Sequence, residues 1–322
     1  MSNTKYEAYH NGKLLMPPID PKRLIELLRI AEHGSYTRAA AAQGVSQPAL
    51  SNSIAALEKS LGVRVLERTR HGATLTDVGR LLASHAAALD SVLARAAGEV
   101  ELKKQGLDGS VVVGVSPIAC VDIVPDAIAR LKRETSNISI HVHERPDDEL
   151  LTDLRSGEID VMISPTGLLT DPPDLEREVL MQDRFAVAMR RKHALARRKS
   201  LSLAELRGQQ WIMPDLHTTM WRQNEALFAA ENEPWPLNCV TTNSVTALKS
   251  LLICSDAVSI ASDRLLKLEI EAGYLTCVPL RRPHFVREIC LRLRRGGNLT
   301  PPAQRFVASL RGVAADMRKR AR

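Results

Sequence analysis

Two short helices joined by a very tight turn are the strongest constraint that this sequence places on its fold. Ser35 is a good cap for an alanine-rich helix over 36–43. Gly44-Val45 then leaves two or three residues for a turn before Ser46 caps the next helix, which Gly62 ends. The apolar stripe of that helix is formed by Leu50, Ile54, Leu57 and Leu61. So short a connection between two short helices is typical of a helix-turn-helix.

The flanking segments complete a small domain around this pair. Asp20-Pro21 begins an earlier helix, which Gly34 ends. After Gly62, extended pieces over 63–66 and 73–75 enclose a polar tip, and this pattern predicts a wing-like hairpin.

A long helix follows, from Thr76 to about Lys104. Apolar residues recur along one side of it, among them Val78, Leu81, Leu93 and Val100. Because the sequence shows no neighbouring element that would bury this side, we expect a second copy of the chain to cover it. The alternative is that the helix packs on its own domain.

The rest of the chain alternates apolar, strand-like runs with helical patterns, which indicates an α/β domain. The patterns form two sets, which predicts two lobes with chain crossings between them. The expected fold class is α+β with several domains, and 322 residues suffice for them. The expected boundaries are a polar leader over 1–19, a winged helix-turn-helix over 20–76, a linker and dimerisation helix over 77–106 and a two-lobed domain over 107–322, with lobe 1 at about 109–166 and 287–315 and lobe 2 at about 167–286.

Composition excludes several classes of protein. A hydrophobic fraction of 44% and a charged fraction of 25% are ordinary globular values. No apolar run reaches the roughly 18 residues of a membrane span, and the first 19 residues lack the apolar stretch of a secretory signal. We therefore expect a cytoplasmic protein with no membrane partner. The five cysteines are odd in number and never form a C-x-x-C pair, which favours reduced, mostly buried thiols, with a redox switch as the alternative.

The net charge of +7 is unevenly distributed. Residues 281–322 carry a net +10, whereas residues 20–104 carry only +3. The basicity thus comes from the C-terminal end, where a solvated basic helix would account for it. A role in DNA binding has to depend on the positions of particular side chains.

Such side chains lie on the second helix of the tight pair. Because its apolar stripe must face the core, Gln47, Ser51 and Asn52 are left near the exposed N-terminal end. Gln and Asn can pair bidentately with adenine, Ser can reach bases or phosphate, and Pro48 can touch thymine methyl groups. A solvated polar face is the simpler interpretation, but the tight turn and the arginines Arg68 and Arg70 occur in the same short stretch.

Residues 28–82 resemble the N-terminal winged helix-turn-helix of the LysR-type transcriptional regulators. The motifs that carry the resemblance are Gly34-Ser35-Tyr36-Thr37-Arg38-Ala39-Ala40, Ser46-Gln47-Pro48-Ala49-Leu50-Ser51, Leu57-Glu58 with Leu61-Gly62, Glu67-Arg68-Thr69, and Leu75-Thr76 with Gly79. Tyr36 and Leu66 stand where the family usually has phenylalanine, and Gln43 stands where it usually has leucine. The first two are shape-compatible core substitutions, whereas Gln43 brings a polar group near the turn.

The resemblance implies a recognition helix over 46–61 that enters the major groove of double-stranded DNA. By the same resemblance the wing approaches a neighbouring minor groove. The DNA-contacting positions that it implies are Ser46 at the start of the recognition helix, Gln47, Pro48, Ser51 and Asn52 near bases, Arg68 and Arg70 in the wing, and Ser35, Thr37 and Arg38 near phosphates.

The remaining chain is similar to the family's effector domain, a two-lobed module like the periplasmic binding proteins, and His193-Ala194-Leu195-Ala196 resembles a loop of its second lobe. Such a fold binds small ligands between its lobes. The candidate positions are Ser116, Ile118, Pro165, Thr166, His217, Thr218, Thr219, Asn243, Ser244 and Val245. Hydroxyls and free backbone N–H groups suit a carboxylate, so we expect a small organic anion; the alternative is that these residues are only helix caps.

Other chemistries have weaker support. The segment 114–118 is a truncated G-x-S-x-G motif without its second glycine, so we expect no enzyme. His141 and His143 share one face of a predicted strand, but a pair alone rarely binds a metal. No nucleotide-binding motif is present, so no cofactor is expected.

The expected function is sequence-specific, effector-controlled regulation of transcription. The resemblance implies a homodimer or homotetramer, and RNA polymerase is a further candidate partner. One alternative is a small-molecule-binding protein that has lost DNA binding, which the intact segment 46–51 argues against. Another is an architectural nucleoid protein, which would need neither a cleft nor sequence preference.

Overall fold

The computed structural model describes residues 9–10, 13–14, 19–69, 72–166, 172–216, 218–237, 239–281 and 286–320. The chain forms two compact units, Met1–Glu101 with Arg155–Glu158 and Leu102–Leu154 with Ile159–Arg322.

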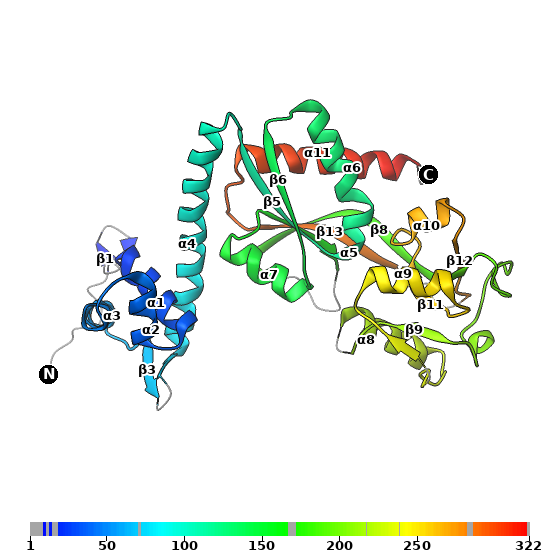
Figure 1. The fold of residues 1–322 in the computed structure, drawn as a ribbon, viewed down its shortest axis with the longest axis horizontal. Helices are drawn as coiled ribbons and strands as arrows, with labels where there is room; N and C mark the ends of the chain where they lie inside the picture. The colour runs from blue at the N-terminus through cyan, green and yellow to red at the C-terminus, as the bar shows by residue number, and fades with distance from the viewer. Residues whose placement is uncertain are drawn as a thin grey trace. The chain divides into compact units, whose positions relative to one another are not determined.

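The first unit contains the expected helix-turn-helix (Figure 1). Its elements in chain order are β1 (Tyr9–His10), β2 (Lys13–Leu14), α1 (Pro21–His33), α2 (Tyr36–Gln43), α3 (Gln47–Leu61), β3 (Leu66–Thr69), β4 (Gly72–Leu75) and α4 (Asp77–Lys104). The predicted caps are confirmed: Asp20, Ser35 and Ser46 each accept a hydrogen bond from a backbone N–H of the helix that follows. The stripe of α3 is buried, since Leu50, Ile54 and Leu57 are at most 1% exposed.

The wing begins three residues later than the sequence predicts. The first strand was expected over 63–66, but β3 spans Leu66–Thr69. The cause is a tertiary contact, because a carboxylate oxygen of Glu58 accepts hydrogen bonds from the backbone N–H groups of Val65 (2.9 Å) and Leu66 (3.3 Å). The segment before Leu66 is thereby held at the end of α3 instead of pairing in the hairpin.

The long helix α4 exposes much of its apolar side in the single chain. Gly79, Ala83 and Ala86 are buried in the first unit. In contrast, Leu81 is 59% and Val92 60% exposed. The larger apolar side chains of α4 thus remain available to a partner.

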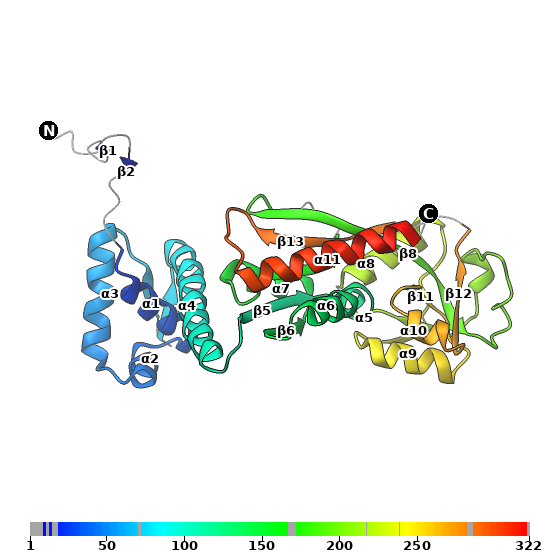
Figure 2. The same cartoon turned by 90° about the horizontal axis from the view of Figure 1, so that it is seen from above.

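The second unit is built on a mixed sheet of seven described strands (Figures 1 and 2). They run in the order β11-β8-β13-β7-β5-β6, and β12 also pairs with β8. Their bounds are β5 Gly109–Val115, β6 Ile138–Glu144, β7 Val161–Pro165, β8 Leu175–Arg190, β11 Ser259–Ser262, β12 Leu275–Pro279 and β13 Val286–Arg294. The parallel strands β6, β5 and β7 belong to the first lobe, and β13 returns to pair with β7 in the antiparallel sense.

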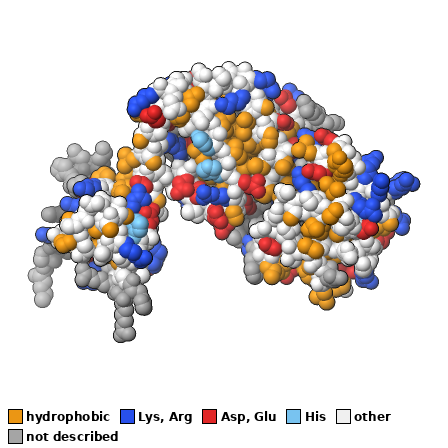
Figure 3. Space-filling view, viewed as in Figure 1, with side chains coloured by type: hydrophobic (Ala, Val, Ile, Leu, Met, Phe, Trp, Pro, Cys, Tyr) orange, Lys and Arg blue, Asp and Glu red, His pale blue; other side chains and the backbone are white. Residues whose placement is uncertain are grey.

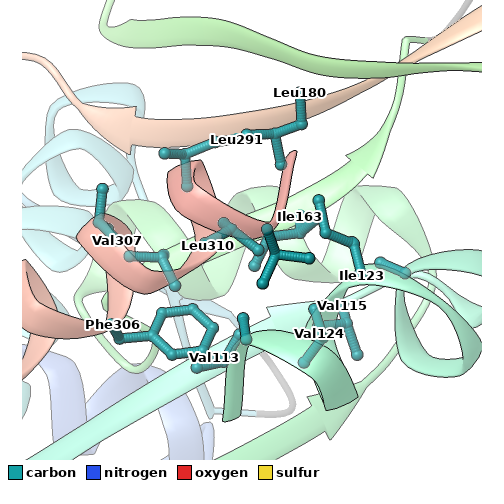
Figure 4. Close-up of a cluster of buried hydrophobic side chains, with 14 of the residues drawn as sticks. Val113, Val115, Ile123, Val124, Ile163, Leu180, Leu291, Phe306, Val307 and Leu310 are labelled. Carbon is teal, nitrogen blue, oxygen red and sulfur yellow. The ribbon is translucent and has the colours of Figure 1, made fainter. Parts of the chain in front are cut away.

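Helices cover the first-lobe sheet, namely α5 (Pro117–Val121), α6 (Ile123–Glu134), α7 (Asp147–Ser156) and α11 (Pro301–Arg320). The main core lies between the sheet and the pair α6 and α11, where Phe306, Leu310 and Val113 are fully buried (Figure 4). Leu150 and Leu154 of α7 form a smaller core with Ile159 and Met162.

The second lobe holds β9 (Trp211–Met213), β10 (Cys239–Thr241), α8 (Thr219–Ala230), α9 (Val245–Cys254), α10 (Lys267–Glu271) and the short 3-10 helix η1 (Ala204–Leu206). The sequence predicts a strand only near 184–189, whereas β8 runs over sixteen residues from Leu175. Its first part pairs with β13 in the first lobe and its second part with β11 and β12 in the second. The chain therefore enters the second lobe within β8, well after the expected boundary near 167.

No helix of the described residues is long and apolar enough to cross a membrane. Those residues also hold no group of three or more His, Cys, Asp or Glu side chains suited to a metal ion. Of the cysteines, Cys290 is buried and Cys254 is exposed, while the other three are partly buried, so "mostly buried" overstates their burial. Burial raises the pKa of Cys120 to about 11 and that of Cys277 to about 12.

Candidate functional site

The N-terminal end of α3 has an exposed polar face. Gln47, Pro48 and Asn52 are exposed and Ser51 is half-buried, whereas the intervening Leu50 is 1% exposed. The buried stripe therefore fixes which side chains point outward. This face presents amide donors and acceptors within two helical turns, as major-groove recognition requires.

Both predicted serines at helix starts serve as caps. Ser46 Oγ accepts from the N–H of Ala49 at 3.3 Å, and Ser35 Oγ accepts from the N–H of Arg38 at 3.2 Å. A capping hydroxyl still has its own O–H to donate, and phosphate oxygens only accept. Thr37 and Arg38 are exposed in the first turn of α2, so this helix start presents several donors together.

The wing is attached to the turn between α1 and α2. The N–H of Ala73 donates to the carbonyl of Gly34 at 3.1 Å. Gly72 has a φ of +140°, and a Cβ there would lie 2.1 Å from that same carbonyl oxygen, so only glycine fits. Of the two predicted wing arginines, Arg68 lies in β3 opposite Ala73, while its side chain and all of Arg70 lie outside the described residues.

Two carboxylates that the sequence left without a role hold α3 in place. Glu58 ties its C-terminal end to the start of the wing through the two hydrogen bonds given above. Glu26 of α1, only 7% exposed, accepts a hydrogen bond from the Ser53 hydroxyl beside Asn52. Gln43, the departure near the turn, donates to the carbonyl of Ala39 in its own helix at 3.3 Å, which satisfies its side-chain N–H.

A cavity of about 960 Å³ lies between the lobes of the second unit. The predicted positions on its wall are Ser116, Ile118, Pro165, Thr218, Thr219, Asn243, Ser244 and Val245. Thr166 is not on the wall, because its side chain and backbone bond with Glu288 of β13. His217 lies outside the described residues.

The hydroxyls on the wall differ in whether they already have partners. Thr218 caps α8 and Ser244 caps α9, so for these two the simpler interpretation as helix caps holds. Ser116, at the start of α5, is 5% exposed, and its Oγ has no hydrogen-bond partner among the described residues. A buried hydroxyl without a partner is costly, so this atom is available to a ligand.

The wall also carries charged groups that were not predicted from the sequence. Arg292 is 3% exposed and donates to Ser164 Oγ at 2.8 Å, and Arg287 donates to Asp183 at 2.8 Å. Burial raises the pKa of Asp147, although the charges of Arg292 and Arg287 oppose the shift. A solvated basic helix does not account for the whole basic C-terminal segment, because Arg287 and Arg292 lie in the paired strand β13, where Arg292 is buried and the side chain of Arg287 is only 9% exposed.

Two family models match the chain. The LysR substrate binding domain matches residues 104–315, and the bacterial regulatory helix-turn-helix protein of the lysR family matches residues 22–80. The transcriptional regulator GbpR of Azospirillum brasilense is 28% identical over 291 residues, which cover 90% of this chain and 85% of that protein. The SDS degradation transcriptional activation protein of Pseudomonas sp. (strain ATCC 19151) is 30% identical over 302 residues, covering 92% and 96%.

Solved structures have the same fold. Full-length OxyR from Pseudomonas aeruginosa superposes with a TM-score of 0.62 at 22% identity, covering 92% of this chain and 95% of that one. The effector binding domain of QuiR, in complex with shikimate, has a TM-score of 0.55 at 19% identity and covers 65% of this chain and 98% of its own.

Proposed function

The chain belongs to the LysR family of DNA-binding transcriptional regulators, and from that premise we propose which residues contact DNA and which class of molecule the effector-binding domain senses. The protein is thus a regulator and not an enzyme. A regulator of chromosomal genes acts where the chromosome is, so we place its activity in the cytoplasm.

We propose that α3 enters the major groove with Gln47, Pro48, Ser51 and Asn52 at the base edges. The exposure of these side chains beside a fully buried stripe supports this assignment. Ser35, Ser46, Thr37 and Arg38 would donate to phosphates, and Arg68 and Arg70 would reach the adjacent minor groove.

The test of base reading is Gln47→Ala on an operator selected from a random duplex library. We expect a loss of about 1 to 3 kcal/mol on the operator and almost none on random DNA. Lys59→Ala, an exposed position in the last turn of α3, is the control and should leave the discrimination intact. An equal loss by Gln47→Ala on both DNAs would contradict base reading.

We propose that the effector is a small organic anion bound between the lobes. The single observation that carries this proposal is the unpartnered, buried hydroxyl of Ser116 on a cavity that Arg287 and Arg292 also line. A carboxylate would accept from that hydroxyl and from free N–H groups at the starts of α8 and α9. The shikimate complex of the structurally similar QuiR domain is consistent with this class.

The effector proposal is tested by screening carboxylates and neutral metabolites for thermal stabilisation of the full chain. All three tryptophans lie in the second lobe, and Trp221 is in the first turn of α8, so their fluorescence reports on the cavity. For a carboxylate hit, Ser116→Ala should weaken binding about tenfold, as one lost hydrogen bond does. Ser136→Ala, at an exposed site off the cavity wall, is the matched control. Stabilisation by neutral compounds alone would refute the anion.

We also propose that the apolar side of α4 joins two copies of the chain. Leu81, Val92 and Leu93 are all more than half exposed on this helix. Large apolar side chains gathered on one exposed face are typical of a protein–protein interface. Light scattering should give a dimer or a tetramer for the wild type and a smaller species for Leu93→Glu. A monomeric wild type would contradict this. RNA polymerase is retained as a further candidate partner.

A further inference from the structure

The start of the second lobe contains a segment with charge of one sign only. Residues 184–204 include seven Lys or Arg and no Asp or Glu. Five of them lie just after β8 and are all exposed, and we call them the basic turn: Arg191, Lys192, Arg197, Arg198 and Lys199. The total net charge of +7 does not reveal this cluster, because residues 281–322 alone carry a net +10.

The backbone of the basic turn is well fixed. The N–H of His193 donates to the carbonyl of Arg190 at 3.0 Å, and the N–H of Ala196 donates to that of His193 at 3.0 Å. His193 is only 6% exposed, and its Nδ1 accepts from the N–H of Leu195 at 3.1 Å. Leu195 and Ala196 pack against the second-lobe core. The apolar middle of the segment therefore faces inward and holds the flanking cations outward.

The nearby acids have their direct partners outside the basic turn, and the charge of Arg198 acts on Glu205 only as a lesser cause of its lowered pKa, after the hydrogen bonds from Ser202. Asp256 pairs with Arg190 at 2.7 Å, and Glu205 pairs with Arg281 and accepts from Ser202. None of the basic turn's five side chains forms an ion pair with another residue that the structure describes. Figure 3 shows blue Lys and Arg side chains gathered at the right-hand end of the second lobe. Most of the repulsion among these charges is therefore left for an external anion to relieve.

We propose that the basic turn is a second DNA-contacting surface, which binds the phosphate backbone of the duplex beside the operator. This inference depends on the proposed function, because it requires the first unit to bring DNA to the same molecule. Once α3 has bound, flanking duplex is present at a high effective concentration, so weak contacts add to affinity.

A duplex fits this surface better than a protein does. Protein interfaces depend on a few exposed aromatic or large apolar anchors. In the segment 191–199 the exposed residues are the five cations and the small Ala194, and its one leucine is half-buried. The neighbouring Tyr274, whose carbonyl accepts from the N–H of Arg191 at 2.9 Å, is 60% exposed and carries a hydroxyl that can donate to phosphate.

The test compares two duplexes, the minimal operator and the same operator extended by about 30 base pairs on each side, over a range of salt. The full chain should bind the extended duplex at least tenfold more tightly. The triple variant Arg197→Gln, Arg198→Gln, Lys199→Gln should lose most of that gain, and its salt slope on the extended duplex should fall by about 2 to 3, as expected for three phosphate contacts. On the minimal operator the triple variant should have the same affinity as the wild type.

The matched control removes three exposed cations from α11, as Arg305→Gln, Arg318→Gln, Lys319→Gln. It should keep the gain from the extended duplex; an equal loss in both triple variants would show a general effect of charge and overturn the proposal. An unchanged tryptophan unfolding midpoint verifies that the basic-turn variant is folded.

Two other results would also overturn the proposal. One is unchanged binding of the extended duplex by the basic-turn variant. The other is a loss confined to anionic vesicles or to polyglutamate, which would assign the surface to a membrane or an acidic protein. These results differ from a failure of the proposed function. In that case the wild type would bind the minimal operator no more tightly than a random duplex of the same length.

Discussion

Glu58 provides the sharpest test of how the helix-turn-helix is held together. Its carboxylate accepts two backbone hydrogen bonds, from Val65 and Leu66, which are 0% and 6% exposed. Each such bond to a charged acceptor contributes about 1.5 kcal/mol. Glu58 itself is half-buried, so solvent reduces the sum, and we expect Glu58→Ala to lower the free energy of unfolding of the first unit by about 2 kcal/mol. Glu58→Gln keeps a carbonyl acceptor without the charge and should cost about 1 kcal/mol.

The distribution of tryptophan makes the assay specific to one unit. Trp211, Trp221 and Trp235 all lie in the second unit, so their fluorescence follows that unit alone during urea unfolding. Far-UV circular dichroism follows both units. Glu58→Ala should move the dichroism transition to lower urea and leave the fluorescence midpoint unchanged.

Two results would refute this reasoning. If Glu58→Ala unfolded at the same urea concentration as the wild type by both probes, the two hydrogen bonds would contribute nothing. If the fluorescence midpoint moved instead, the effect would not originate in the first unit. The expected order of stability, wild type above Glu58→Gln above Glu58→Ala, is an internal control.

Three further predictions concern the second unit. Because burial raises the pKa of Asp147, anion affinity should be highest below that raised pKa and fall as pH rises through it, and Asp147→Asn should flatten the pH profile measured by tryptophan fluorescence. At pH 8, iodoacetamide should label the exposed Cys254 well before Cys277, whose pKa burial raises to about 12; equal rates by mass spectrometry would contradict the described burial. Asp122→Asn removes the buried partner of Arg264 and should lower stability by about 2 kcal/mol in thermal unfolding, so an unchanged midpoint would show that the pair is not stabilising.

Local signals predicted the helix boundaries of the first unit. Each cap depends on one side chain and on N–H groups within three residues of it, as at Ser35 and Ser46. The start of the wing was misplaced because it depends on Glu58, seven residues away on another element. A pattern read within a short window does not contain that contact.

In the candidate site, too, local signals were sufficient for some residues and not for others. The eight predicted residues that line the cavity lie at strand ends or helix starts. The sequence indicates such ends through local patterns. Thr166 has the same local signature, but its bonds to Glu288 depend on the pairing of β13 across more than a hundred residues. Arg292 was missed for that reason too, since only the position of β13 between β7 and β8 turns it inward.

The cavity and the crossing between the lobes share side chains, which gives a ligand a direct route to the geometry of the domain. Asp183 lies on β8, the strand that passes between the lobes, and it is fully buried. It accepts hydrogen bonds from Ser262 of the second lobe and from Arg287 at the start of β13. Ser262 and Arg287 both line the cavity. An anion that draws Ser262 or Arg287 toward itself weakens the hydrogen bond of that donor to Asp183, so occupancy of the cavity changes the bonds between the crossing strand and the two lobes.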